Sequence, residues 1–407
     1  MSNLVPEGWY KSKLGLEAYL TMGQSPLSDT YNFEREGLPF FQGKTDFGTH
    51  RPKVRVWCNN PTKIAKKNSI LFSVRAPVGE VNITDNDCCI GRGLAGIIGK
   101  TIDQSYLYQN IQFLKKMFIL LAQGSTFEAV NGSELKEFPL ILPPLPEQQK
   151  IAKILTSVDE VIEKTQAQID KLKDLKTGMM QELLTHGIGH TEFKDSPVGR
   201  IPADWSVVKI ADLCSHVVDC VNKTAPVVDF KTPYKMIRTT NVRHGRVDTE
   251  NVRCVTKETF ELWTRRLLPE NGDLIFTREA PVGECGILKD SRGVFLGQRT
   301  MMYRASKART SAEFLMYSIM SDYGKQQLED FSGGSTVGHM RVPDCGRILI
   351  KTPPLDEQAK IVKLLGSVDT SILVKEKKLA KINHSKKALM QDLLTGKVRV
   401  KVDSEYQ

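Results

Sequence analysis

Two stretches of the chain, residues 143–188 and 353–398, carry a hydrophobic spacing that predicts long helices. Apolar side chains recur three and four positions apart, which places them along one stripe of a helix, as in a coiled coil. The positions of the two stripes are Ile162, Thr165, Ile169 and Leu172 in the first stretch, and Ile372, Lys375, Leu379 and Ile382 in the second. A stripe of this length needs a partner helix to cover it.

The two stretches are copies of one another. They align at a constant offset of 210 without a gap, and 20 of 46 aligned residues are identical. The simplest partner for each helix is therefore the other copy, packed antiparallel. The alternative is that each helix packs only on its own domain, which the length and the polar opposite face disfavour.

The segments before the helices repeat more loosely. VPEGW at 5–9 matches IPADW at 201–205, and ILFSVRAPVGEV at 70–81 matches LIFTREAPVGEC at 274–285. Alternating apolar residues predict strands, and apolar residues three to four apart predict amphipathic helices. The predicted strands include 54–57 and 274–277, and the predicted helices are 106–122 and 313–331.

The predicted fold class is α+β, with an internal pseudo-twofold repeat. Two related mixed α/β domains are separated by two long antiparallel helices that form a coiled-coil spacer. The predicted boundaries are 1–142 for the first domain, 143–187 for the first helix, 188–200 for a linker, 201–352 for the second domain, 353–397 for the second helix and 398–407 for a tail.

Composition narrows the class of protein. The chain carries 57 Lys and Arg against 47 Asp and Glu, a net charge of +10 that favours polyanionic partners, nucleic acid first. Its eight cysteines form no CxxC pair, so reduced thiols are a better interpretation than disulfides or zinc. No run of 18 apolar residues and no signal-like start occur, so we expect a cytoplasmic protein.

A search for catalytic and metal-binding motifs finds none. Gly-Lys-Thr at 43–45 and 99–101 lacks the upstream glycine of a P-loop, because Leu38 and Leu94 stand there. The two Pro-Pro pairs lack the flanking residues of an amino-methyltransferase loop. His186 and His190 are four apart, but two intervening glycines disfavour helical metal-ligand geometry. We therefore expect no catalytic residue and no metal site.

The repeated motifs resemble a known family. PPLPEQQKIA at 143–152 and PPLDEQAKIV at 353–362 are similar to the start of the helical spacer in specificity (S) subunits of type I restriction–modification systems. MQELLT at 180–185 and MQDLLT at 390–395 are similar to spacer ends, and VRAPVGE at 74–80 resembles a stretch of the family's recognition domains.

The resemblance implies a function and partners. Each recognition domain would read one half of a split double-stranded DNA target, and the spacer would fix the distance between the halves. Two modification (M) subunits would dock on this chain and bring S-adenosylmethionine. Restriction (R) subunits would add ATP- and Mg²⁺-dependent translocation and cleavage. The chain itself would bind no cofactor. The alternatives are a helical protein-interaction scaffold without DNA reading and a self-sufficient DNA enzyme.

Specific reading requires Arg, Asn or Gln in a groove, while Lys, Arg and turn amides hold phosphates. Two basic, glycine-punctuated stretches lie near predicted strands at equivalent places in the two domains. The candidate DNA-binding residues are Gln42, Lys44, Arg51, Lys53, Arg55, Ser125 and Thr126 in the first domain, and Thr239, Asn241, Arg243, His244, Arg246, Ser335 and Thr336 in the second.

Each candidate has a plainer interpretation. Any single charge among them is as compatible with a solvated surface as with DNA, and only the clusters favour DNA. The Gly-Ser-Thr turns at 124–126 and 334–336 are equally compatible with caps that bind nothing. We expect Arg238 to be internal. For Arg75 and Arg278 we expect structural ion pairs first and DNA contacts second.

Overall fold

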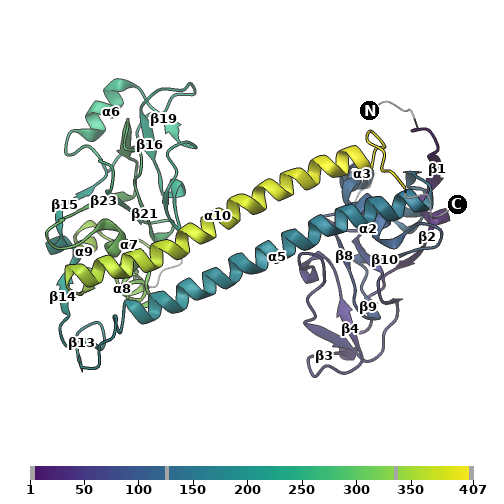
Figure 1. The fold of residues 1–407 in the computed structure, drawn as a ribbon, viewed down its shortest axis with the longest axis horizontal. Coiled ribbons are helices and arrows are strands. Elements are labelled where there is room, and N and C mark those ends of the chain that lie inside the picture. The colour runs from purple at the N-terminus through teal and green to yellow at the C-terminus, as the bar shows by residue number, and fades with distance from the viewer. Residues whose placement is uncertain (1–4, 124–127, 334–337, 403–407) are drawn as a thin grey trace. The chain divides into compact units, whose positions relative to one another are not determined.

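The computed structural model describes residues 5–123, 128–333 and 338–402. Its contacts divide the chain into two units: residues 1–168 with 375–407, and residues 169–374 (Figure 1). This division differs from the predicted boundaries because the helices α5 (Leu145–Leu183) and α10 (Leu355–Leu393) each contribute one part to both units. Each unit is described by itself.

Unit 1 contains two main sheets. An antiparallel four-stranded sheet has the order β2 (Ala18–Met22), β10 (Leu94–Gly99), β7 (Ile70–Ser73) and β8 (Val81–Ile83). A five-stranded sheet has the order β3 (Tyr31–Asn32), β5 (Val56–Cys58), β4 (Leu38–Phe41), β9 (Cys88–Ile90) and β6 (Ile64–Ala65), in which β4 and β9 are parallel. A ribbon of β1 (Tyr10–Lys13) and β11 (Pro139–Leu142) completes the unit together with α1 (Leu14–Glu17) and α4 (Gly132–Glu137).

Unit 2 has the same plan with extensions. Its six-stranded sheet has the order β15 (Cys214–Asp219), β23 (Thr300–Ala305), β20 (Leu274–Arg278), β21 (Val282–Ile287), β18 (Gly245–Val247) and β17 (Val242–Arg243). A smaller sheet has the order β19 (Arg253–Cys254), β16 (Lys235–Ile237) and β22 (Val294–Leu296), with β16 and β22 parallel. Strands β14 (Ser206–Lys209) and β24 (Leu349–Thr352) pair separately. The helix α6 (Lys257–Thr264) packs on β22, and the short helix α9 (Val342–Cys345) precedes β24.

The shared plan confirms the predicted relation between the two recognition domains. The order β2-β10-β7-β8 of unit 1 recurs as β15-β23-β20-β21 in unit 2, and the parallel pair β4/β9 recurs as β16/β22. The four strands that the two units share in each larger sheet pack on a helical segment, and buried aromatic rings such as Phe72 with Phe118 and Phe276 with Tyr303 lie in the cores. One sequence unit used twice therefore gives one architecture used twice.

The two predicted amphipathic helices are each broken into two. Residues 106–122 belong to α2 (Gln104–Phe113) and α3 (Lys115–Gln123), and residues 313–331 belong to α7 (Ala312–Met320) and α8 (Asp322–Ser332). At the second break the backbone of Ser321 is extended, and its hydroxyl accepts a hydrogen bond from Gly324 N–H. The apolar stripe continues across the break, which is why the hydrophobic pattern alone gave one helix.

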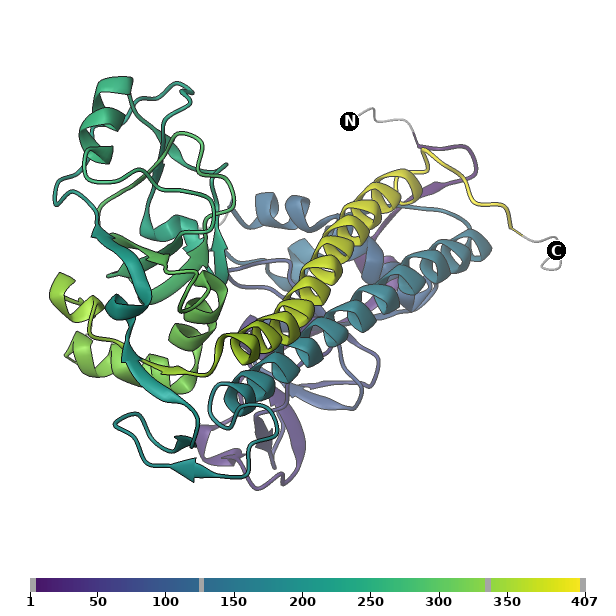
Figure 2. The ribbon, with the colours of Figure 1, turned by 60° about the vertical axis from the view of Figure 1, so that its left-hand side comes forward.

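Within each unit the two long helices run antiparallel (Figures 1 and 2). In unit 1, Lys386 of α10 forms an ion pair with Asp159 of α5 at 2.6 Å, and Lys375 Nζ donates to Gln168 Oε1 at 2.7 Å. In unit 2, Lys176 pairs with Asp369 at 2.8 Å. Residue numbers rise along one helix as they fall along the other, which confirms the predicted antiparallel pairing.

The helices also pack on the domains, in addition to their pairing with one another. Ile151 and Leu155 of α5 and Met390 of α10 belong to the core of unit 1. Among the positions of the predicted stripe, Ile162, Ile169 and Ile372 are buried, whereas Leu172, Leu379 and Ile382 are half-buried.

Equivalent contacts hold the first turn of each long helix. Trp9 donates its indole N–H to Glu147 at 3.2 Å, and Arg399 forms two 2.8 Å bonds to the same carboxylate. In unit 2, Trp205 donates to Glu357 at 3.0 Å, and His190 Nε2 lies 2.9 Å from that carboxylate. His190 is therefore engaged with Glu357, and His186 lies beside Glu182.

Candidate nucleic-acid interface

In each unit, two loops meet where a pair of parallel strands ends. In unit 1, β4 and β9 lead into the loops 42–46 and 91–93, and Gly91 N–H donates to Phe41 O at 2.9 Å. In unit 2, β16 and β22 lead into the loops 238–241 and 297–299, and Gly297 N–H donates to Ile237 O at 2.7 Å. The same backbone bond therefore joins equivalent loops in both domains.

A third loop, the Ala-Pro-Val-Gly turn, adjoins this pair in each unit. Val74 N–H donates to Gly93 O at 3.0 Å, and at the equivalent place Arg278 N–H donates to Arg299 O at 2.9 Å. Inside the turn, Ser73 Oγ donates to Pro77 O and Thr277 Oγ1 donates to Pro281 O, both at 2.6 Å. Three loops thus gather at one edge of each recognition domain.

The structure brings the first-domain candidates to this edge and beside it. Gln42 is exposed, and its backbone N–H donates to Asp46 at 2.7 Å. Lys44 is exposed and lies 3.5 Å from Glu80, while Arg55 forms a 2.5 Å ion pair with Asp46. Three side chains of the predicted type therefore surround one short 3₁₀ turn, η2 (Lys44–Asp46).

The two other first-domain candidates lie further along the same loop. Arg51 is half-exposed and pairs with Asp85 at 3.0 Å. Lys53 is exposed, and its backbone N–H donates to Asp46 O. Surface ion pairs such as that of Arg51 contribute little to stability, so a phosphate can compete for the guanidinium.

In the second domain, a hairpin of β17 and β18 carries the predicted basic residues. Arg243 donates to the carbonyls of Thr239 and Val242, both at 2.6 Å, and so holds the half-buried 3₁₀ turn η4 (Thr239–Asn241). Arg246, opposite Arg243 in the hairpin, is exposed, as is His244, whose backbone N–H donates to Glu284 at 2.9 Å.

Asn241 is placed differently from the prediction. Its side chain is only 6% exposed, and its amide accepts from Arg238 N–H at 3.1 Å and donates to Asn251 O at 2.8 Å. A buried amide with both ends bonded to the backbone shapes the loop rather than facing DNA. Sequence reasoning selected it because Asn is a common adenine-reading residue, and burial could not be seen.

Replacing Asn241 by Ala should lower the free energy of unfolding by about 1–3 kcal/mol, because a buried backbone donor and acceptor lose their partners. Thr240→Ala, at the exposed neighbouring position, serves as the control and should change it by less than about 0.5 kcal/mol. Urea denaturation measures both. Equal small effects would show that the amide carries no structural role.

Four predicted contacts, Ser125, Thr126, Ser335 and Thr336, lie outside the described residues. Arg278 is buried and donates to Met340 O at 3.1 Å, so it bonds a carbonyl instead of the predicted acid. Arg75 is exposed, and no acidic partner is found for it in the described part of the chain. Arg238 is half-buried, with its Nε inside the protein, close to the internal position expected for it.

Sequence reasoning missed the loops 91–93 and 297–299. Arg92 is exposed, and Gln298 is half-buried with its Oε1 accepting from Thr224 at 3.0 Å. Their position beside Gln42 and Arg238 depends on backbone bonds between residues about 50 or more positions apart. A glycine directly after a buried apolar strand was the only local signal.

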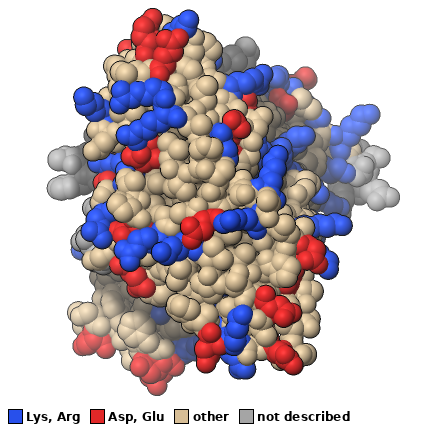
Figure 3. Space-filling model, turned by 90° about the vertical axis from the view of Figure 1, so that its left-hand side faces the viewer, with Lys and Arg blue, Asp and Glu red and all other residues tan. Residues whose placement is uncertain are grey.

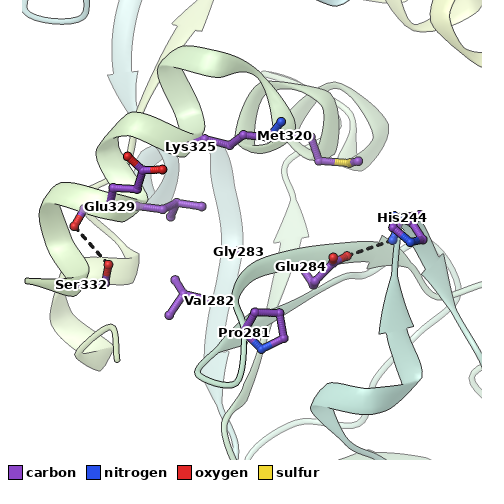
Figure 4. A pocket seen from close by; sticks show the side chains of 10 residues that line it. His244, Pro281, Val282, Gly283, Glu284, Met320, Lys325, Glu329 and Ser332 are labelled. Carbon is purple, nitrogen blue, oxygen red and sulfur yellow. Dashed lines mark hydrogen bonds between the residues drawn. The ribbon is translucent and has the colours of Figure 1, made fainter. Parts of the chain in front are cut away.

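A recess lies behind the Ala-Pro-Val-Gly turn in both units. In unit 2 it is a cavity of about 440 Å³ in which Pro281, Val282 and Glu284 face Met320 and Lys325 of the helical segment (Figure 4). The unit 1 cavity of about 230 Å³ has Pro77, Val78, Glu80 and Lys115 at equivalent positions.

Lys115 and Glu80 form a 2.8 Å ion pair at the unit 1 recess. Burial raises the pKa of Glu80, but the hydrogen bonds and charges of Lys115 and Lys44 together outweigh it and leave that pKa below its ordinary value. The recess therefore keeps a charged pair at its edge near neutral pH. Unlike the loops 42–46 and 238–241, it retains Pro, Val, Glu and Lys in both copies.

Charge on the face drawn in Figure 3 is mixed. Lys and Arg form short groups separated by acidic and uncharged residues. Within the described ranges, no group of three or more His, Cys, Asp and Glu residues is arranged to hold a metal ion. The eight cysteines are free, and six of them are buried. Among the described residues, no helix is long and apolar enough to cross a membrane.

Comparison with known proteins identifies a family. The family model for the type I restriction modification DNA specificity domain matches residues 51–174 and again residues 202–384. The MjaVIII type I restriction enzyme specificity subunit of Methanocaldococcus jannaschii is 32% identical over 310 residues, which cover 74% of this chain and 72% of that protein. The MjaIX specificity subunit of the same organism is 24% identical over 353 residues, covering 83% and 79%.

A solved structure shows the same fold. The type I restriction-modification S subunit from M. genitalium superimposes with a TM-score of 0.62 at 14% identity, covering 97% of this chain and 98% of that one. The double match of the family model spans most of the chain, in agreement with the duplicated domains and helices. The chain therefore belongs to the family of DNA specificity subunits of type I restriction–modification systems.

Proposed function

We propose that each recognition domain reads one half of a two-part DNA target and that α5 and α10 fix the distance between the halves. The observation that carries this proposal is the trio of loops that recurs at the same edge of both domains with different side chains. A common backbone with divergent side chains is what two readers of unlike half-sites require, since base edges are distinguished by side-chain donors and acceptors.

The proposal includes partners and a division of labour. Two modification subunits would bind this chain, and restriction subunits would join them in the full complex in the cytoplasm. S-adenosylmethionine, ATP and Mg²⁺ would bind to those partners, while this chain would contribute no catalytic group. Support comes from surfaces that both copies share: a partner present twice would meet the Pro-Val-Glu-Lys recess at equivalent places in the two units.

Selection from random duplexes tests the DNA-reading role. The full-length chain, alone and with its modification subunits, should enrich two short base blocks separated by a constant gap. Affinity should fall steeply as salt rises, because phosphate contacts release counterions. A protein-interaction scaffold without DNA reading would enrich no sequence, and its DNA affinity would change little with salt.

Arg246→Ala offers a more local test. If Arg246 holds a phosphate near the second-domain loops, its loss should weaken binding uniformly across sequences and reduce the salt slope by about one. Lys257→Ala removes the same charge from the exposed surface of α6 and serves as the control. Salt titrations of DNA binding measure both variants. An unchanged slope for Arg246→Ala, or an equal change for both variants, would contradict a contact at Arg246.

A further inference from the structure

The loops at the ends of the parallel strands present a reversed pair of side chains. Gln42 follows Phe41 and Arg92 follows Gly91, the two residues joined by the backbone bond of unit 1. Arg238 follows Ile237 and Gln298 follows Gly297, which are joined by the equivalent bond of unit 2. The first domain thus carries Gln then Arg where the second carries Arg then Gln.

The two members of each pair start from backbones in close contact. A Cβ at Gly91 would lie 3.1 Å from Gln42 Cα, and a Cβ at Gly297 would lie 2.6 Å from Ile237 O. A side chain at position 297 would force the loops apart, and one at position 91 would press on the backbone of Gln42, so glycine suits both positions. The contact fixes where the next residue of each loop begins, and it does so in the same way in both domains.

These side chains keep donors available. Gln42 and Arg92 are exposed. Arg238 is half-buried: its Nε lies inside the protein, and within the described residues its terminal Nη groups donate no hydrogen bond to the protein. Gln298 uses its Oε1 to accept from Thr224, which orients the amide, and its NH₂ group has no acceptor among the described residues. Each pair therefore retains side-chain donors that no protein group among the described residues satisfies.

We propose that Gln42 with Arg92, and Arg238 with Gln298, are specificity-determining pairs that read base edges in the major groove. Arg forms two hydrogen bonds with O6 and N7 of guanine, and Gln forms two with N6 and N7 of adenine. Each half-site then contains one guanine and one adenine read by these loops. The loop that reads guanine in one domain is equivalent to the loop that reads adenine in the other. This inference rests on the proposed DNA-reading function.

Divergence between the copies favours bases over phosphates. Where the copies share a task, they retain residue types, as at Pro77 and Pro281 or at Lys115 and Lys325. A phosphate looks alike in both half-sites and would be served by the same side chain twice. Here the backbone bonds are retained while Gln and Arg exchange places, so the feature that differs between the domains is the base that each position accepts.

Selection from random duplexes with the full-length chain tests the pairs. Arg92→Gln should change the preferred base at one position of one half-site from guanine to adenine, by about tenfold or more, and leave the other half-site unchanged. Gln298→Arg should change adenine to guanine at one position of the other half-site. Lys136→Gln, on the exposed surface of α4, removes one charge from unit 1 and is the control expected to leave both blocks unchanged.

Three results would overturn the inference. Arg92→Gln could retain the guanine preference, or it could weaken all sequences equally with a smaller salt slope, as loss of a phosphate contact does. If Arg92→Gln is poorly folded, Gln42→Arg provides a second test in unit 1. An unchanged base preference in that variant would count equally against the inference. If the unaltered chain enriches no two-part sequence, the proposed DNA-reading function is wrong. If it enriches one and the variants leave the preferred bases unchanged, only the assignment of these pairs is wrong.

Discussion

Replacing Asp159 by Ala is expected to destabilise unit 1 by about 3–5 kcal/mol, because it leaves the ammonium group of Lys386 buried without a counter-charge. Both side chains are only 10% exposed, and their charged atoms are 2.6 Å apart. Gln109 donates a further 2.6 Å hydrogen bond to the same carboxylate. The loss therefore removes an ion pair and leaves a buried amide donor unpartnered.

Amide hydrogen exchange in α5 and α10 measures this loss, because it reports the stability of each segment rather than one transition for the whole chain. The matched control is Glu160→Ala on the same helix, whose 3.8 Å pair with Lys164 is largely exposed. That change should cost about 0.5 kcal/mol or less. If both variants lose the same protection, the buried pair does not hold the helices together.

A double replacement distinguishes the loss of the ion-pair attraction from the cost of leaving one buried charge without a partner. Asp159→Leu combined with Lys386→Met removes both charges and should cost less than Asp159→Ala, since no buried ion remains unpaired. At the repeat-equivalent pair, Asp369 is 31% exposed, so Asp369→Ala should have a smaller effect. In unit 2 the hydroxyl of Tyr317, which donates to Asp369 at 2.7 Å, occupies the role that Gln109 has in unit 1.

Features that depend on regular spacing could be predicted from the sequence. The stripes of α5 and α10 and their constant offset predicted two long antiparallel helices, because helical periodicity and internal duplication are both visible in one dimension. The related Ala-Pro-Val-Gly turns predicted that the two domains share one plan. The breaks between α2 and α3 and between α7 and α8 could not be seen, since the apolar pattern continues across them.

The loop trio depended on contacts distant in sequence and was only partly predicted. Gln42 and Lys44 were selected because they lie in a basic, glycine-containing stretch. Arg92 was missed because only the parallel pairing of β4 with β9 brings it beside them. Asn241 was selected by residue type, yet its side chain is buried and donates to Asn251 O, and no local signal separates an amide that holds a loop from one that reads a base.

The position of the ion pairs along the helices leads to the prediction with the largest functional effect. The interval from Asp159 to Lys176 in α5 equals the interval from Asp369 to Lys386 in α10, so both pairs form with one register. Seven residues inserted into α5 alone, between Gln168 and Ile169, would preserve the heptad phase of the stripe. They would lengthen one interval by about 10.5 Å.

With α5 lengthened alone, the Asp159–Lys386 and Lys176–Asp369 pairs cannot both form. We expect the helix segments around one pair to lose their hydrogen-exchange protection. Binding to the two-part target should fall below detection.

A matching insertion in α10, between Val374 and Lys375, restores equal intervals. The doubly extended chain should recover both pairs and select half-sites about three base pairs further apart, at about 3.4 Å per base pair. Selection from duplexes with variable gaps measures the shift. A single insertion that keeps the original gap, or a double insertion that does not change it, would show that the paired helices do not set the distance between the half-sites.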